Sequence, residues 1–157
     1  MNINLSETRR KTLSVNQYVE SLEQPFQDKF LTFKSTYQLN REAVDYLKEN
    51  SSKYMVVAFS ASWCKDCAKS ISILAMLSDA AGLEVRIFGG LKRDPLSTVS
   101  KWRIPPSPPE VESFRVDKIP LIVVFDEEGK EVGRMVETPK FAPSVECEIS
   151  EIIKCRQ

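Results

Sequence analysis

Residues 55–67 read MVVAFSASWCKDC. The apolar run Met55–Phe59 follows turn residues and predicts a strand that is covered on both faces. The pair Cys64 and Cys67 then opens a stretch whose apolar residues have helical spacing and which Gly82 ends. The sequence therefore predicts a buried strand, a short connection, and a helix that begins at the two cysteines.

A cysteine at a helix N-terminus lies beside unpaired N–H groups and the positive end of the helix dipole, which favour its thiolate. Only the thiolate attacks a disulfide. Lys65 adds a nearby positive charge and Asp66 opposes it. Cys67 would lie one helical turn further along, close enough to attack a mixed disulfide on Cys64. The spacing therefore favours a redox pair.

A structural zinc site is the main alternative for a Cys-x-x-Cys pair, and it needs two more ligands. Cys147 and Cys155 do not form a second such pair. On one helix they would lie ~12 Å apart, too far for a disulfide with each other. We interpret them as buried or incidental thiols, with a second redox site as the alternative. We expect no bound metal, although a metal or iron–sulfur site shared across a dimer remains a weaker hypothesis.

The composition is that of an ordinary globular domain, with 157 residues, 42% apolar and 28% charged. The 22 basic and 22 acidic residues balance, which gives no indication of nucleic acid or an anionic membrane as a partner. The chain has no histidine, so histidine ligands and Cys–His or Ser–His pairs are excluded. The basic run at residues 9–11 precedes a polar stretch and no membrane-length apolar run follows, so we expect a cytoplasmic protein.

The remaining elements follow from spacing and turn residues. Residues 1–13 are polar, and we expect them to be frayed. Pro25 is expected in the first turn of a helix, and Asn40 is a predicted N-cap. We expect helices within 14–36 (two of them), 40–50, 68–81, 94–102 and 145–153, strands over 55–59, 83–88, 121–125 and 131–136, and a stiff proline loop over 104–109.

A βαβ unit followed by a hairpin and a closing helix predicts an α/β fold with a mixed central sheet and helices on both faces. We divide the chain into an N-terminal helical extension packed on the core (residues 1–39) and a main domain (residues 40–157). The extension carries aromatic residues at helical spacing, Tyr18, Phe26, Phe30 and Phe33. They predict an apolar helix face packed on that core, with a dimer or partner surface as the alternative.

Two segments resemble known proteins. Residues 62–67 (SWCKDC) after a buried strand resemble the active-site segment of thioredoxins, and residues 118–125 (KIPLIVVF) followed by Gly129 resemble their cis-proline segment and hairpin. The similarity covers about residues 40–155. The extension, together with the motifs at 133–134 and 137–139, resembles a bacterial and archaeal branch of thioredoxin-like proteins.

The resemblance implies a role for each matching residue. Cys64 corresponds to the nucleophile, Cys67 to the resolving thiol and Trp63 to the flanking aromatic residue. Pro120 corresponds to the cis-proline, although the residues alone allow a trans proline at a strand's first position. The backbone of Ile119 would bind an extended substrate segment. The implied reaction reduces a disulfide-containing protein or small molecule, with no bound cofactor, and takes electrons from a separate reductase or low-molecular-weight thiol.

The sequence also departs from the thioredoxin pattern. The usual buried aspartate is replaced by Ala58, the residues between the cysteines are Lys65 and Asp66 instead of Gly-Pro, and a helix proline is replaced by Ser72. These departures motivate a second hypothesis. In it the fold is kept as a binding or adaptor module, in which the extension and the Pro105–Pro109 loop recognise a partner.

Overall fold

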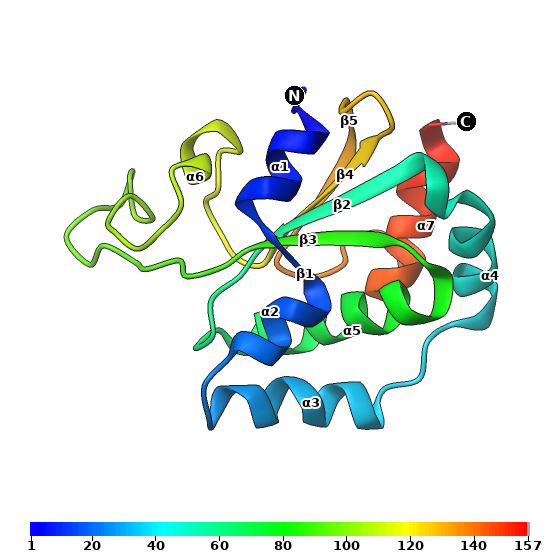
Figure 1. Ribbon diagram of the computed structural model, residues 1–157, viewed down its shortest axis with the longest axis horizontal. Helices are drawn as coiled ribbons and strands as arrows, with labels where there is room; N and C mark the ends of the chain where they lie inside the picture. Colours follow the sequence, from blue (N-terminus) through cyan, green and yellow to red (C-terminus); the bar gives the residue numbers. More distant parts are fainter. Residues whose placement is uncertain (157) are drawn as a thin grey trace.

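The computed structural model describes residues 1–156 and contains a five-stranded sheet (Figure 1). The strand order is β1-β3-β2-β4-β5. Strands β2 and β3 are parallel, and the other neighbouring pairs are antiparallel. The strands are β1 (Leu13–Ser14), β2 (Tyr54–Phe59), β3 (Glu84–Phe88), β4 (Leu121–Asp126) and β5 (Glu131–Val136). The predicted mixed sheet is therefore confirmed.

The central strands carry the core. Every residue of β2 and β4 is buried, as expected for continuous apolar runs covered on both faces. Their register pairs Phe59 with Leu121, which places the end of β2 beside the start of β4. The segments after β2 and before β4, which the sequence resemblance singles out, therefore meet at one end of the sheet.

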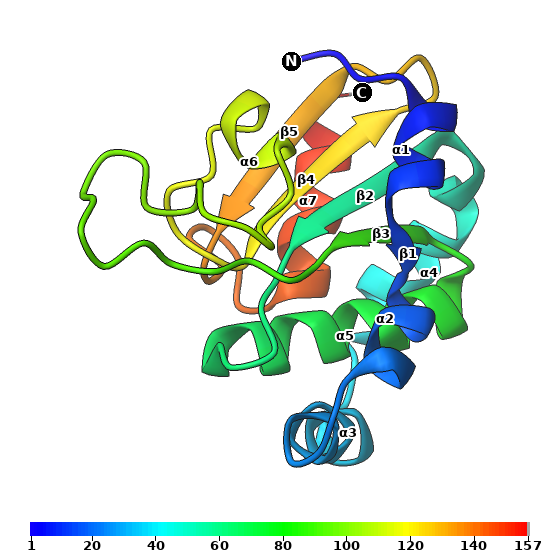
Figure 2. The same cartoon turned by 60° about the vertical axis from the view of Figure 1, so that its left-hand side comes forward.

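Helices cover both faces of the sheet, as Figure 2 shows. Helices α5 and α7 lie on one face, α4 packs against both of them, and α3 lies against the outer side of α5. The short helices α1 and α6 lie on the opposite face, where Phe114 packs edge-on against Phe59. The helices are α1 (Leu5–Lys11), α2 (Val15–Ser21), α3 (Phe26–Thr36), α4 (Arg41–Asn50), the 3₁₀ turn η1 (Ser51–Lys53), α5 (Lys65–Ala81), α6 (Glu110–Ser113) and α7 (Val145–Arg156). No helix within residues 1–156 is long and apolar enough to cross a bilayer.

Several predicted helix ends are confirmed. The Asn40 side chain accepts a hydrogen bond from the Ala43 N–H (3.0 Å) and caps α4. Gly82 ends α5 in the left-handed conformation (φ 71°), which costs glycine little because it has no Cβ. Pro25 directly precedes α3 and does not lie inside its first turn.

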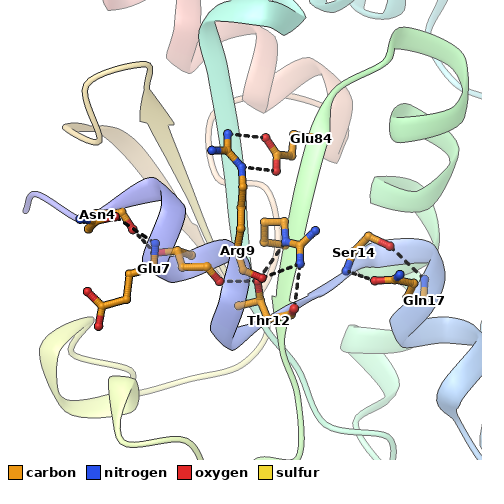
Figure 3. A network of polar contacts seen from close by, with 9 residues as sticks. Asn4, Glu7, Arg9, Thr12, Ser14, Gln17 and Glu84 are labelled. Atoms are coloured by element: carbon orange, nitrogen blue, oxygen red, sulfur yellow. Dashed lines mark hydrogen bonds and ion pairs between the residues drawn. The ribbon is translucent and has the colours of Figure 1, made fainter.

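The expectation that residues 1–13 are frayed is wrong. Asn4 caps α1 by accepting from the Glu7 N–H (2.9 Å), and β1 pairs with β3. The Arg9 guanidinium forms two hydrogen bonds of 2.8 Å with Glu84 on β3 (Figure 3). The polar side chains of this segment cap its helix and bond to the edge strand of the sheet. A pattern of polar residues does not distinguish such bonded side chains from solvated ones.

The expected helix over residues 94–102 is also absent, and turns replace it. The Asp94 side chain accepts from the Leu96 N–H (3.0 Å), and the Ser97 hydroxyl accepts from the Ser100 N–H (2.9 Å). Such local bonds compete with helix formation, and the apolar side chains Leu96 and Val99 are 96% and 92% exposed. The proline loop that follows has neither helix nor strand until α6, a single turn that the sequence analysis did not predict.

The first 39 residues are packed on the rest of the chain. Strand β1 joins the sheet, and α2 and α3 pack against α5. Tyr18 and Phe30 from the predicted aromatic face are buried, whereas Phe26 and Phe33 are only partly covered. The division of the chain at residue 40 itself stays a prediction.

Candidate active site

The cysteine pair lies where β2 passes into α5. The Cys64 N–H donates to the Ala61 oxygen (3.3 Å), which closes a tight turn after the strand. Cys64 is the N-cap residue of α5, with extended backbone (φ −82°, ψ 118°), and its Sγ accepts the backbone N–H of Cys67 at 3.2 Å. The sulfur therefore occupies the place of a capping oxygen, which is where a negative charge is stabilised.

The two thiols differ in exposure and in acidity. Cys64 is partly exposed and Cys67 is fully buried. Hydrogen bonding with the Cys67 thiol lowers the pKa of Cys64, the Cys67 backbone N–H lowers it further, and partial burial and the Asp66 carboxylate act in the opposite direction. Burial raises the pKa of Cys67 far above its usual range, and the neighbouring Cys64 sulfur adds to that rise. Cys64 is thus the accessible, more acidic thiol, and Cys67 is held protonated behind it.

Lys65 and Asp66 are both exposed in the first turn of α5. The Asp66 carboxylate acts to raise the pKa of the Cys64 thiol, whereas hydrogen bonding with the Asp66 backbone lowers it. Both side chains face water beside the cysteine pair, where they are available to contact a bound molecule.

The segment before β4 meets the cysteines. The peptide bond between Ile119 and Pro120 is cis, and both residues are buried. The Cys64 thiol donates to the Ile119 backbone oxygen at 3.9 Å, a long sulfur hydrogen bond. Residues 55 positions apart in the sequence are thereby brought together.

Trp63 is 53% exposed beside Cys64. Its ring stacks on that of Trp102, with centroids 6.2 Å apart and planes inclined by 21°. Trp102 is buried and its Nε1–H donates to the Asp117 oxygen (2.8 Å). The long connection between β3 and β4 therefore supports the aromatic residue at the site.

A groove of about 630 Å³ runs beside Trp63. Its walls combine the N-terminal extension, the end of β3 and the proline loop. They include Tyr18, Leu22, Phe26, Trp63, Gly90 and Pro106. The extension and the proline loop thus both reach the neighbourhood of Cys64.

Sequence reasoning missed two hydroxyl groups behind the cysteines. Ser60 follows β2 directly and is fully buried, and its hydroxyl lies 3.0 Å from the Tyr18 hydroxyl. Hydrogen bonding with the Ser60 hydroxyl acts to lower the pKa of the Cys67 thiol, against the effect of burial. The signal for Ser60 was its position between a fully apolar strand and the cysteine pair. Tyr18 had no such signal, because its spacing predicts only a core residue.

The other two cysteines lie on α7, where Cys147 is partly exposed and Cys155 is exposed. Both are free. Within residues 1–156 no three histidine, cysteine or acidic residues are gathered in a group that could hold a metal ion.

The strand order, the cysteine pair at the start of α5 and the Ile119–Pro120 segment together define a protein of the thioredoxin fold. A family model described as Thioredoxin matches residues 12–150. The chain therefore belongs to the thioredoxin family.

Two solved structures share this fold at low sequence identity, and a third is similar over a smaller part of the chain. A protein of unknown function, PA1234 from Pseudomonas aeruginosa, is 19% identical with a TM-score of 0.72, covering 99% of both chains. An HIV epitope scaffold is 17% identical with a TM-score of 0.71, covering 98% of this chain and 99% of the other. A structure named DsbH oxidoreductase is 19% identical with a TM-score of 0.44 over 76% of this chain and 84% of its own. A comparison with curated proteins gives no match.

Proposed function

We propose that the protein is a thiol–disulfide oxidoreductase that reduces disulfides through Cys64 and Cys67. The observation that carries the proposal is the Cys64 sulfur at the N-cap of α5, 3.2 Å from the Cys67 N–H and with its pKa lowered. A partly exposed thiol of low pKa in front of a buried thiol of high pKa suits a sequential attack.

In the first step the Cys64 thiolate attacks one sulfur of a substrate disulfide. A bond forms between Cys64 and that sulfur, the substrate S–S bond breaks, and the other substrate sulfur leaves as a thiolate that takes a proton from water. Cys64 performs this step because it alone of the pair is accessible.

In the second step Cys67 gives up its proton and attacks the Cys64 sulfur. The Cys64–Cys67 disulfide forms, the bond to the substrate breaks, and the released substrate thiolate takes up a proton. The substrate gains two electrons and the protein pair loses two. A separate reductase or a low-molecular-weight thiol then restores the dithiol, so no bound cofactor is needed.

The substrate proposed here is a protein or small molecule that carries a disulfide. An extended segment would lie along the Ile119 backbone beside Pro120, with the exposed Trp63 ring on one side. Lys65 and Asp66 would contact the substrate from the start of α5. Nucleic acid and membranes are not among the proposed partners, and a reducing compartment such as the cytoplasm suits a protein that works from its dithiol form.

The test is the reduction potential of the pair, measured by equilibration with glutathione or dithiothreitol and trapping of free thiols. A value near roughly −270 mV supports a general reductant, and a value of roughly −120 to −180 mV supports an oxidase or isomerase. A Cys64→Ser variant is expected to reduce no disulfide. The proposal would be contradicted if the parent protein formed no Cys64–Cys67 disulfide at any ratio of oxidised to reduced glutathione or dithiothreitol.

A binding module is the second candidate. It is favoured by Ala58, which is fully buried at the position of the usual aspartate, and by the groove that the extension lines. A variant with both Cys64→Ser and Cys67→Ser separates the two candidates. An adaptor keeps its partner and its cellular role in this variant, whereas an oxidoreductase loses its role.

A further inference from the structure

The environment of the Cys67 thiol opposes the formation of the thiolate that the resolving step requires. Cys67 must become a thiolate to attack, yet it is fully buried, and burial raises its pKa strongly. Ala58 supplies no carboxylate to take its proton. The Cys64 sulfur also raises the pKa of Cys67. The Ala61 backbone N–H and the Ser60 hydroxyl act in the opposite direction and lower it.

The Ser60 hydroxyl is held in a fixed place. Ser60 is fully buried, and its backbone N–H donates to the Phe88 oxygen (3.0 Å), which ties the end of β2 to the end of β3. Its Oγ lies 3.0 Å from the Tyr18 hydroxyl. Ser60 therefore joins a tyrosine of the N-terminal extension to the segment that leads from β2 into the cysteine pair.

Tyr18 is equally constrained. It is 5% exposed on α2, and its ring packs edge-on against Phe30, with centroids 6.2 Å apart. On another side it lies so close to Gly89 that a Cβ there would be 2.5 Å from the Tyr18 ring. Burial raises the pKa of Tyr18 to about 12, so its hydroxyl stays protonated and can donate.

We propose that Tyr18 and Ser60 form a buried hydroxyl relay that stabilises the Cys67 thiolate in the resolving step. The Tyr18 O–H donates to Ser60 Oγ, and the Ser60 O–H donates to the Cys67 sulfur as its negative charge develops. Hydrogen bonds to a charged acceptor are the strong ones, and a chain of them is polarised in one direction. In this relay Ser60 is the group that donates to the reacting sulfur, and Tyr18 is a positioning residue.

The relay carries no net proton. The Cys67 proton ends on the substrate thiolate released in the same step, so atoms and electrons balance as in the second step above. The titratable groups around Cys67 are Tyr18 from α2, Cys64 at its own helix start, and the exposed Asp66 and Lys65 of α5. This inference rests on the proposed function, because it describes how the second thiol of that reaction is activated.

The experiment separates the two steps with dithiobis-nitrobenzoate, an aromatic disulfide that releases one coloured thiolate at each. It is performed on full-length protein carrying Cys147→Ser and Cys155→Ser. The first phase reports the Cys64 attack and the second reports resolution by Cys67. Ser60→Ala is expected to slow the second phase about tenfold and to move its pH profile upward by about one unit, while the first phase keeps its rate. Tyr18→Phe is expected to slow the second phase about threefold with a shift in the same direction.

Matched variants test whether the loss of any other hydroxyl would also slow the second phase. Ser72→Ala removes a buried hydroxyl that donates to the Phe30 oxygen (2.7 Å), and Tyr37→Phe removes a hydroxyl bonded to Glu146 (2.7 Å). Both are expected to leave the second phase unchanged. If Ser60→Ala does not fold, the relay is tested by comparing the second phase of Tyr18→Phe with that of Tyr37→Phe.

An unchanged second phase in Ser60→Ala and Tyr18→Phe would overturn the relay. A loss that affects both phases equally, or one without a shift of the pH profile, would overturn it too, since either indicates a structural role. Absence of a second phase in the parent protein would instead contradict the proposed function.

Discussion

The indole rings of Trp63 and Trp102 stack, with Trp63 53% exposed and Trp102 5% exposed. The exposed ring beside Cys64 is thus supported by one whose place is fixed by burial and by a hydrogen bond to the Asp117 oxygen. The two rings contribute differently to stability and to the site.

We expect Trp102→Ala to lower the free energy of unfolding by about 3 kcal/mol, because it removes a buried ring and leaves a cavity. Trp63→Ala is expected to cost less than about 1 kcal/mol, because half of the ring is already in water. Urea unfolding of both variants measures the difference. Equal costs would show that Trp63 is held as firmly as Trp102.

The cysteines are expected to react with iodoacetamide in a fixed order. Because the pKa of Cys64 is lowered, its thiolate forms at a lower pH than that of an ordinary cysteine, whose pKa is about 8.5. Cys64 is therefore expected to react at a lower pH than an ordinary thiol. Cys67 has a raised pKa and is buried, so it reacts only after unfolding. Mass spectrometry of protein alkylated across a pH series assigns each site.

The control for this order is Cys64→Ser in protein that also carries Cys147→Ser and Cys155→Ser. It is expected to show no reactive thiol near neutral pH. Fast alkylation of Cys67 in folded protein would reverse the assignment of attacking and resolving thiols.

The ion pair between Arg9 and Glu84 predicts a pH-dependent contribution to stability. Hydrogen bonding with Arg9 lowers the pKa of Glu84, so the pair stabilises the fold above the unfolded pKa of about 4.3 and loses that effect as the pH falls through the folded pKa. Because the pair is partly exposed, we expect Glu84→Gln to cost only about 0.5–1 kcal/mol near pH 7. The difference from the parent should be smaller at about pH 3 than near pH 7.

Urea unfolding at the two pH values measures this difference. Glu20→Gln, at an exposed position of α2, serves as the control and is expected to change little at either pH. A Glu84→Gln cost that persists unchanged at low pH would assign the effect to packing and not to charge.

Gly89→Ala is expected to disturb the cysteine pair from a distance. The new Cβ would lie 2.5 Å from the Tyr18 ring and force it away from Ser60. Gly133→Ala is the matched variant, since its Cβ would lie 2.8 Å from Ile152, away from the cysteines. Both are expected to lose about 1–3 kcal/mol of stability, and only Gly89→Ala should slow the resolving step. Equal slowing in both would indicate a general effect of instability.

The sequence allowed much of this fold to be predicted, because the central strands are continuous apolar runs and the main helices have clear ends. Asn40 caps the start of α4 and Gly82 caps the end of α5, the positions that these residue types favour. Cys64 and Cys67 were placed from local spacing alone. The cis bond at Pro120 was expected only through the family resemblance, because X-Pro bonds are usually trans.

Two of the failures arise from contacts between distant parts of the chain, and the missing helix over residues 94–102 is explained by local hydrogen bonds. Residues 1–13 are ordered by bonds to β3 that no local pattern encodes. Residues 94–102 have helical spacing, yet two of their apolar side chains have nothing to pack against. The contact between Tyr18 and Ser60 spans 42 positions and depends on how α2 folds back over the end of β2.

The short strand β1 also has a protective consequence. It pairs with β3 through Leu13 and Ser14 only, and it occupies the outer edge of the sheet there. A bare β3 would present unpaired N–H and C=O groups, which readily recruit a strand from another chain. Leu13 and Ser14, which lie between α1 and α2, therefore cover part of this edge and oppose self-association and aggregation through it.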